Sequence, residues 1–487
     1  MSNEIRNLEP KALWNNFADL NAVPRPSKKE GRVIEFIKKF GESLGLPTSV
    51  DETGNVIIKK PASAGMENRE TVCLQSHLDM VHQKNNDTNF DFSTEGIQMY
   101  VDGDWVRAKG TTLGADNGIG VSTIMSILAS KDIAHPPLEA LFTIDEETGM
   151  TGAIGLKGGL LNAGILLNLD TEDDHELTIG CAGGVDVTAN GNYYEEKTPA
   201  DAVGYLLTLK GLAGGHSGME IHLGKGNANK LINRILQQAS ENFGIRVSSI
   251  DGGGLRNAIP RESKSELVVP KDKEADFKKF VESEAAVLKK EYATTDPGLQ
   301  VVLEPKEITG KVLSKEFQDT LLRAIYAAPN GIFRMSPDIK DLVQTSNNVA
   351  RVLLKDSLYT IQNLTRSSVD SEKMDLAREI RCTFELTGAK VDFNGGYSGW
   401  TPKPETPIVK LMSSLYREMF KTEPLVDACH AGLECGIIGT NYPNMQMISF
   451  GPNILGAHSP DERVQISSVQ KFWGFLVETL GKMPDKM

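Results

Sequence analysis

Histidine and acidic side chains follow three predicted strands of this 487-residue sequence, at the points where the strands end. His77 follows the apolar segment 71–76, an acidic run with Glu146 and Glu147 follows a second apolar strand, and Asp170 ends a third. In an open α/β sheet, ligands bind beyond the carboxyl ends of the strands. We therefore expect these side chains to meet at one edge of a sheet, although each alone could be a surface or solvated loop residue.

Two further candidates lie at the borders of predicted helices. Asp116 stands in a glycine-flanked turn before a predicted helix over 117–130, where it could also be only the helix N-cap. His458 lies in a loop after a predicted strand over 444–450, where a surface histidine is the plain alternative. Two imidazoles and three carboxylates suit zinc, manganese or cobalt, and five ligands with one bridging carboxylate suit two cations better than one. This candidate ligand set is His77, Asp116, Glu147, Asp170 and His458.

Two neighbouring carboxylates are left without a metal in this scheme. Glu146 directly precedes Glu147, and a free carboxylate beside an activated water is the expected general base. Asp79 follows His77 by two positions, so its carboxylate could hold the second ring nitrogen of that histidine and fix the tautomer. The pattern thus predicts metal-assisted hydrolysis.

Length and charge limit the classes of protein. A chain of 487 residues exceeds the size of a single ordinary core, so two domains or more are expected. The formal net charge of −13 disfavours a nucleic-acid or anionic-membrane partner. The polar N-terminus resembles no secretory signal, no run of about 20 apolar residues occurs, and the five cysteines form no CxxC pair. We therefore expect a cytoplasmic protein without a membrane anchor.

The alternation of apolar segments predicts an α/β fold. Helical spacing over 29–44, 407–420 and 466–482 alternates with short buried strands, which is typical of a mostly parallel mixed sheet flanked by helices. The character changes near residue 185, and a turn-rich segment near 396 looks like a crossing between domains. We expect a discontinuous catalytic domain over 1–185 and 396–487, with an α+β domain inserted over 186–395.

The motifs resemble those of a known group of enzymes. His77-Leu78-Asp79, Gly114-Ala115-Asp116-Asn117-Gly118, Asp145-Glu146-Glu147, Asn168-Leu169-Asp170 and Ala457-His458-Ser459 follow the order found in the co-catalytic zinc peptidases. That family includes carboxypeptidase G, aminoacylase, peptidase T and carnosinase. The chain length and the segment His430-Ala431-Gly432-Leu433-Glu434-Cys435-Gly436 most resemble its bacterial aminoacyl-histidine dipeptidases (Xaa-His dipeptidases, carnosinase-like).

The resemblance implies roles for individual residues. Asp116 would bridge two metals, His77 with Asp170 would complete one site, and Glu147 with His458 the other. Asp79 would orient His77, and Glu146 would act as the base. The inserted domain would be a lid, in which His216 polarises the scissile carbonyl, Asn257 lies near the substrate, and Arg366 holds the substrate carboxylate. Ordinary loop or strand surface is the weaker alternative for each of these three lid residues.

The predicted activity is hydrolysis of the peptide bond of dipeptides, either Xaa-His or a broad range, by a two-metal peptidase. Zinc is the first choice of metal, with manganese or cobalt as alternatives. An aminotripeptidase and an N-acyl-amino-acid deacylase share the same ligands, and a catalytically silent, metal-binding regulatory homologue is a third alternative. Small peptides are the expected partners. Whether the protein forms a homodimer stays open. In short-lid relatives the partner subunit completes the active site, and the long insert could make that contribution within one chain.

Overall fold

The computed structural model describes residues 3–308 and 310–486, and the chain divides into two compact units. Unit 1 comprises Met1–Gly180, Trp400–Ala428 and Leu433–Met487. Unit 2 comprises Cys181–Gly399 and Cys429–Gly432. Unit 2 therefore interrupts unit 1 in the sequence.

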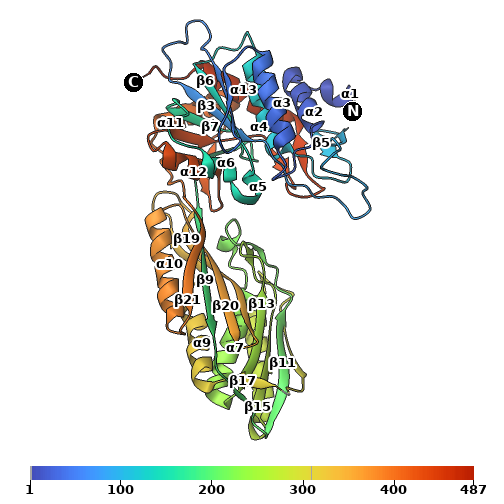
Figure 1. Ribbon diagram of the computed structural model, residues 1–487, viewed down its shortest axis with the longest axis vertical. Helices are drawn as coiled ribbons and strands as arrows, with labels where there is room; N and C mark the ends of the chain where they lie inside the picture. Colours follow the sequence, from blue (N-terminus) through green and yellow to red (C-terminus); the bar gives the residue numbers. More distant parts are fainter. Residues whose placement is uncertain (1–2, 309, 487) are drawn as a thin grey trace. The chain divides into compact units, whose positions relative to one another are not determined.

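Unit 1 contains an eight-stranded sheet, a four-stranded sheet and the helices that flank them (Figure 1). The large sheet has the order β1 (Thr48–Val50), β2 (Val56–Lys60), β6 (Leu138–Thr143), β3 (Val72–His77), β7 (Ile165–Asn168), β23 (Gln446–Ser449), β8 (Glu176–Cys181) and β22 (Leu425–Cys429). The small sheet has the order β24 (Ile454–Leu455), β25 (Arg463–Gln465), β5 (Trp105–Ala108) and β4 (Met99–Asp102). The helices are α1 (Asn3–Arg6), α2 (Lys11–Asn21), α3 (Gly31–Ser43), α4 (Ala115–Ala129), α5 (Glu146–Gly149), α6 (Thr151–Gly155), α11 (Pro407–Phe420), α12 (Glu434–Asn441) and α13 (Ile466–Gly481).

The centre of the large sheet is parallel and fully buried. Strands β6, β3, β7 and β23 run parallel, whereas β1, β2 and β8 pair antiparallel with their neighbours. Every residue of β3 and β6 is buried, because helix α4 packs against β3 and both faces of a parallel sheet are normally covered. Parallel strands end at a common edge, so the residues that follow β3, β6 and β7 are brought together.

Unit 2 is built on a nine-stranded antiparallel sheet. Its order is β16 (Gln300–Pro305), β11 (Ala202–Lys210), β15 (Ser263–Pro270), β13 (Arg246–Gly253), β19 (Val343–Lys355), β20 (Leu358–Ser367), β9 (Gly183–Asn192) and β21 (Lys390–Tyr397), with β18 (Gly331–Met335) paired to β19. Two short pairs are β10 (Glu195–Lys197) with β17 (Lys311–Leu313) and β12 (Gly215–His216) with β14 (Ala258–Ile259). The helices are α7 (Ala228–Phe243), α8 (Glu274–Glu291), α9 (Lys315–Ala327), α10 (Asp370–Glu385) and the short 3-10 helices η1 (Ile221–Leu223) and η2 (Lys271–Lys273).

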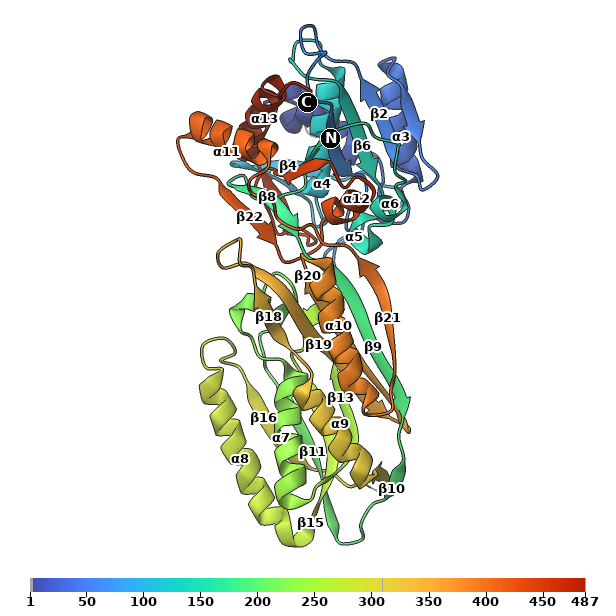
Figure 2. The same cartoon turned by 90° about the vertical axis from the view of Figure 1, so that its left-hand side faces the viewer.

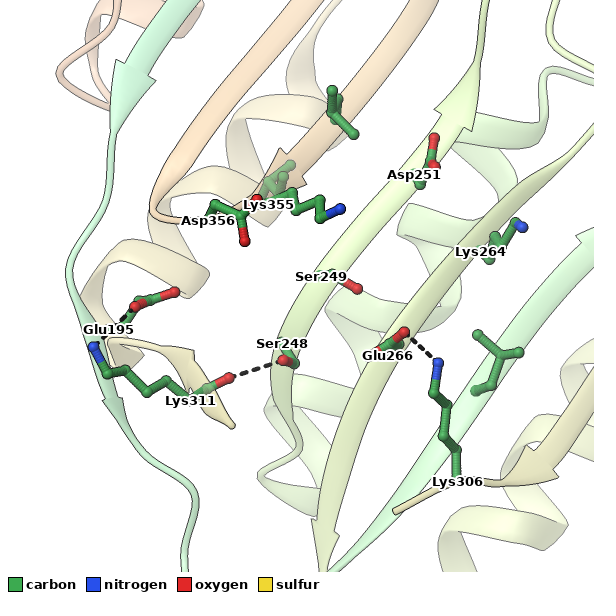
Figure 3. Close-up of a pocket in the computed structure, with 13 residues that line it drawn as sticks. Glu195, Ser248, Ser249, Asp251, Lys264, Glu266, Lys306, Lys311, Lys355 and Asp356 are labelled. Carbon is green, nitrogen blue, oxygen red and sulfur yellow. Dashed lines mark hydrogen bonds and ion pairs between the residues drawn. The ribbon is translucent and has the colours of Figure 1, made fainter. Parts of the chain in front are cut away.

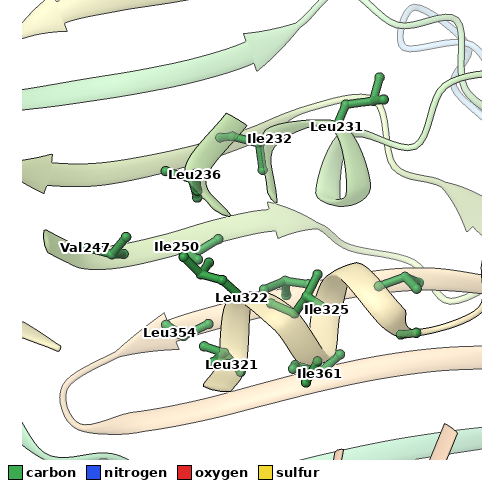
Figure 4. Packing of buried hydrophobic residues seen from close by; sticks show 14 of the residues in the cluster. Leu231, Ile232, Leu236, Val247, Ile250, Leu321, Leu322, Ile325, Leu354 and Ile361 are labelled. Carbon is green, nitrogen blue, oxygen red and sulfur yellow. The ribbon is translucent and has the colours of Figure 1, made fainter. Parts of the chain in front are cut away.

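The two faces of this sheet differ in chemistry. Helices α7 to α10 lie on one face (Figure 2), and apolar side chains such as Leu236, Ile250 and Leu322 fill the core between them (Figure 4). Alternate strand residues line a hollow on the sheet with charged groups, including the Lys311–Glu195 ion pair at 3.3 Å (Figure 3). The described residues that line this hollow include no histidine, so it offers no counterpart to the predicted metal ligands.

The predicted fold class is confirmed as a mixed sheet with a parallel centre, flanked by helices, with an inserted α+β domain. Helices expected over 29–44, 407–420 and 466–482 are observed as α3, α11 and α13. In the described part of the chain, none of the helices has the length and apolarity needed to span a bilayer.

Candidate metal centre

Three neighbouring strands carry candidate ligands to the same edge of the large sheet. His77 is the last residue of β3, Glu147 lies in α5 directly after β6, and Asp170 follows β7 by two positions. His77 is 1% exposed, and its Nε2 atom lies 3.4 Å from Oδ1 of Asp170. The carboxyl ends of parallel strands thus produce this part of the cluster.

Asp116 lies between the two imidazoles. Its Oδ1 atom is 3.0 Å from Nε2 of His77, and its Oδ2 atom is 3.3 Å from Nε2 of His458. Gly114, just before it, has a φ of +70°, and an added Cβ there would meet the Arg25 guanidinium at 2.5 Å. Only glycine fits that left-handed, crowded position comfortably. One oxygen of Asp116 therefore faces each histidine, as a bridging carboxylate requires.

His458 reaches the centre from a hairpin loop between β24 and β25. Its Nε2 atom lies 3.0 Å from Oε2 of Glu147, whose side chain is 4% exposed. The side chain of His458 is 56% exposed, so the centre has a buried side at His77 and an open side at His458. The structure thereby brings together all five candidate ligands, although they span almost four hundred positions of the sequence.

The donor set fits two divalent cations. His77, Asp116 and Asp170 form one group of ligand atoms within 4.8 Å of one another, and Asp116, Glu147 and His458 form a second. Oε1 of Glu147 is buried without a hydrogen-bond partner among the described residues. Unpaired buried carboxylate oxygens are costly unless something positive meets them. Imidazole and carboxylate ligands without thiolates suit zinc, manganese or cobalt.

Mutual pairing dominates the electrostatics of these groups. Hydrogen bonds to Asp116 and Glu147 raise the pKa of His458 to about 11. Burial works against ionisation of Asp116, but hydrogen bonds from His458 and His77 hold its pKa below its usual range. The carboxylates thus favour positive charge between them. Cations can take that role only when both imidazoles are deprotonated, so binding should release protons.

Asp79 connects His77 to the acidic turn. Its Oδ1 atom lies 3.3 Å from Nδ1 of His77, and its carboxylate accepts the backbone N–H groups of Glu146 at 3.0 Å and Glu147 at 3.3 Å. Burial raises the pKa of Asp79, but His77 and the Glu146 N–H lower it overall. The expected position of Asp79 behind the histidine is observed, and an anionic Asp79 can fix which ring nitrogen faces the centre.

Glu146 lies beside the ligands. One of its oxygens is within 4.8 Å of a His77 ring nitrogen and of a Glu147 oxygen. Burial raises the pKa of Glu146 well above its usual range, and the charges of Asp170 and Glu147 raise it further, against the effect of His77. A raised pKa makes the carboxylate form more basic, which is the direction that a general base requires.

The three candidate residues of unit 2 lie on or directly beside three strands, β12, β14 and β20. His216 pairs with Ala258 in the short β12–β14 ladder, and Ser217 donates its N–H to the Asn257 carbonyl at 2.8 Å. Arg366, on β20, is 4% exposed and donates from Nη1 to the Tyr397 hydroxyl at 2.9 Å.

Gly218 shows how close two of these side chains are. A Cβ on Gly218 would lie 3.1 Å from the His216 ring and 3.2 Å from Nε of Arg366. That Nε is buried without a hydrogen-bond partner among the described residues. An unpaired buried guanidinium nitrogen is suited to an anionic ligand such as a carboxylate.

Buried charged residues around the centre were not found from the sequence. Arg25 is 1% exposed and donates to the backbone carbonyls of Leu78, Asp79 and Gly114. Glu462 is 2% exposed and accepts the backbone N–H groups of residues 113–116. No local pattern in the sequence indicates that Glu462 is buried, because its hydrogen-bond partners lie almost 350 positions away.

Glu434 is a further buried carboxyl that the sequence did not single out. It is fully buried at the start of α12, and its Oε2 accepts hydrogen bonds from Gln75 and Thr143, each at 2.6 Å. Burial raises the pKa of Glu434 to about 7, although His77 and the Thr143 hydroxyl lower it. A carboxyl with a raised pKa favours the folded state below its unfolded pKa, and that contribution is lost as pH rises through about 7.

Glu434→Gln should therefore flatten the pH dependence of stability. The shift corresponds to about 3 kcal/mol at most, so the variant should be more stable than the parent near pH 8 and about equal near pH 5. Thermal unfolding of both proteins across that range measures the difference. Parallel profiles would show that Glu434 does not carry this dependence.

Comparison with known proteins supports the same chemistry. Residues 73–482 match the model of peptidase family M20/M25/M40. The chain is 44% identical over 483 residues to the cytosol non-specific dipeptidase of Escherichia coli (strain K12), which covers 99% of this chain and 100% of that protein.

Solved structures agree in fold. The crystal structure of aminoacylhistidine dipeptidase from Vibrio alginolyticus has a TM-score of 0.93 and 42% identity, with 99% of both chains covered. A tripeptidase from Staphylococcus aureus, 14% identical over 97% of this chain and 98% of its own, has a TM-score of 0.57 and is similar in fold alone. The family model matches most of the chain, and the 44% identity to the dipeptidase extends over 99% of it. This chain belongs to peptidase family M20/M25/M40.

Proposed function

We propose that the protein is a metallo-dipeptidase that hydrolyses the peptide bond of dipeptides with two divalent cations. The observation that carries the proposal is Asp116, whose two oxygens each face one imidazole at 3.0 and 3.3 Å. The end-to-end similarity to a non-specific dipeptidase supports dipeptides rather than tripeptides or N-acyl amino acids as substrates. The retained Glu146 argues against a catalytically silent homologue.

Zinc is the proposed metal, with manganese and cobalt as alternatives. His77 and Asp170 would hold one cation, Glu147 and His458 the other, and Asp116 both. When bound, the cations would supply positive charge that lowers the pKa of water and polarises the scissile carbonyl. The imidazole and carboxylate donors suit all three metals, and zinc is preferred because the motifs resemble those of the co-catalytic zinc peptidases.

Glu146 would move the proton in the reaction. Its carboxylate would take a proton from the attacking water and deliver that proton to the nitrogen of the leaving amine. Burial and the neighbouring carboxylates raise its pKa, and the hydrogen bond from the Glu146 N–H to Asp79 holds the turn on which it stands. Asp79 would act through His77, by holding the tautomer that presents Nε2 to the metal.

Unit 2 would act as the lid that binds the substrate. His216 would donate a hydrogen bond to the oxyanion that develops on the scissile carbonyl, and Asn257 would bind the substrate nearby. Arg366 would bind the free C-terminal carboxylate, where a planar guanidinium can make two parallel hydrogen bonds. The buried, unpaired Nε of Arg366 supports this role. A cytoplasmic location is also proposed, from the end-to-end similarity to a cytosolic relative.

Arg366→Lys should raise KM for dipeptides by about 10- to 100-fold, because a paired charged hydrogen bond contributes about 1.5–3 kcal/mol. Lysine keeps the charge and loses the fork of donors. Dipeptides with an amidated C-terminus should be poor substrates for the parent protein and no poorer for the variant. Arg351→Lys, on the neighbouring strand β19 and paired with Asp251, is the matched control. A KM that rises equally for free and amidated substrates would contradict the carboxylate role.

The substrate class is tested with a panel on zinc-loaded protein. The panel contains several dipeptides, among them Xaa-His peptides, together with a tripeptide and an N-acetyl amino acid. We expect turnover of dipeptides with varied side chains and little turnover of the others. Preferred hydrolysis of the tripeptide or of the N-acetyl amino acid would favour the aminotripeptidase or the deacylase instead.

A further inference from the structure

Glu462 binds a run of backbone N–H groups in front of the proposed bridging ligand. Its side chain is 2% exposed, although it stands in a surface hairpin loop. Its two oxygens accept hydrogen bonds from four consecutive residues: Oε2 from Leu113 at 2.7 Å and Gly114 at 3.0 Å, and Oε1 from Ala115 at 2.8 Å and Asp116 at 3.2 Å.

The loop that contains Glu462 contacts Asp116 twice. Nε2 of His458 lies 3.3 Å from Oδ2 of Asp116, and Glu462 accepts the backbone N–H of the same aspartate. The loop is tight, with the Glu462 N–H bonded to the Ser459 carbonyl at 3.0 Å. A shift of the loop would therefore move the side chain and the backbone of Asp116 together.

Arg25 binds the same segment through its carbonyl groups. It donates to the Gly114 carbonyl at 2.6 Å and to the Leu78 and Asp79 carbonyls at 3.1 Å each. The buried Glu462 carboxyl group thus holds the N–H groups of this segment, and the buried Arg25 guanidinium holds one of its carbonyl groups. This arrangement connects the position of Asp116 to the residues that follow His77.

We propose that Glu462 is a positioning residue that orients the Asp116 carboxylate between the two cation sites. The inference rests on the proposed function, because it assumes that Asp116 bridges two metals. Glu462 acts through Asp116 and touches neither cation nor substrate. Partners that orient a ligand in this way commonly change metal affinity by about 10- to 100-fold when they are lost.

The substitution Glu462→Gln separates a role in orienting Asp116 from a contribution to the stability of the fold. Glutamine has nearly the shape of glutamate, but its NH2 group would face two N–H donors, so half of the hydrogen bonds would be lost. Glu139 is the matched control in the same unit. It is 3% exposed and accepts the backbone N–H groups of Asn162 at 2.8 Å and Ala163 at 3.0 Å, near the amino end of β6, at the other end of the strand from Glu146.

The experiment compares the parent protein, Glu462→Gln and Glu139→Gln after removal of metal. Zinc affinity is measured by competition with a chromophoric chelator, and the visible absorption of the cobalt-loaded proteins reports ligand geometry. We expect Glu462→Gln to lower zinc affinity by about 10- to 100-fold and to alter the cobalt spectrum. Glu139→Gln should lower the melting temperature but leave affinity and spectrum unchanged.

Several outcomes would overturn the inference. Parental zinc affinity in Glu462→Gln would do so, as would an equal loss of affinity in Glu139→Gln. If Glu462→Gln does not fold, Glu462→Asp decides, since it keeps both oxygens but shortens the reach: lowered affinity supports the role, and parental affinity contradicts it. A parent that binds none of zinc, manganese and cobalt would overturn both this inference and the proposed function. A parent that binds two zinc ions but hydrolyses no dipeptide would overturn the proposed function only.

Discussion

Glu146→Gln should lower kcat for dipeptide hydrolysis by about 10²- to 10⁴-fold while two zinc ions stay bound. Glutamine cannot accept the proton of the attacking water, yet it fills the same space beside His77 and Glu147. The N–H of residue 146 still donates to Asp79, so the turn that carries Glu147 should keep its shape. Steady-state kinetics and metal analysis on the same sample measure the two effects together.

Asp145→Asn is the control for this substitution. Asp145 directly precedes Glu146, is 6% exposed, and accepts hydrogen bonds from the Thr148 and Thr151 hydroxyls. Its replacement disturbs the same turn and removes a neighbouring negative charge, but leaves the proposed base in place. We expect a modest change in kcat. Full turnover by Glu146→Gln with both metals bound would contradict the base assignment, and loss of metal would show that Glu146 serves as a ligand.

The sequence was sufficient for the strand ends because that information is local. Apolar runs over 71–76 and 138–144 correspond to strands β3 and β6, which are buried at every position. A polar residue directly after such a run must lie at the end of the strand. Parallel pairing then brings His77 and Glu147 to one edge without further information.

The buried charged residues around the metal ligands could not be predicted in the same way. Glu462 and the N–H groups of residues 113–116 are separated by almost 350 positions, and their contact depends on how the β24–β25 hairpin pairs with β5. Arg25 and Glu434 are ordinary charged residues in the sequence, and only the packed structure shows that they are buried. Charged residues are seldom fully buried, so a sequence-based reading places them at the surface by default.

Asp116→Ala should remove both zinc ions and lower turnover by about 10³- to 10⁵-fold, since bound cations contribute several kcal/mol to such a reaction. The reason is the shared position of this carboxylate, which faces His77 with one oxygen and His458 with the other. Removing it deletes one ligand from each group, so each cation site keeps only two of its three ligands. Zinc stoichiometry under buffered free zinc, measured alongside kcat, tests the expectation.

Asp170→Ala is the informative comparison, because Asp170 belongs to the group with His77 and not to the group with His458. It should lower the stoichiometry from two zinc ions to one, while Asp116→Ala lowers it to none. Retained heat stability in both variants would show that metal loss is local and does not come from unfolding of unit 1. If Asp116→Ala instead keeps one zinc ion as tightly as Asp170→Ala does, Asp116 serves a single site, and the two-metal centre proposed for this peptidase would need a different bridge.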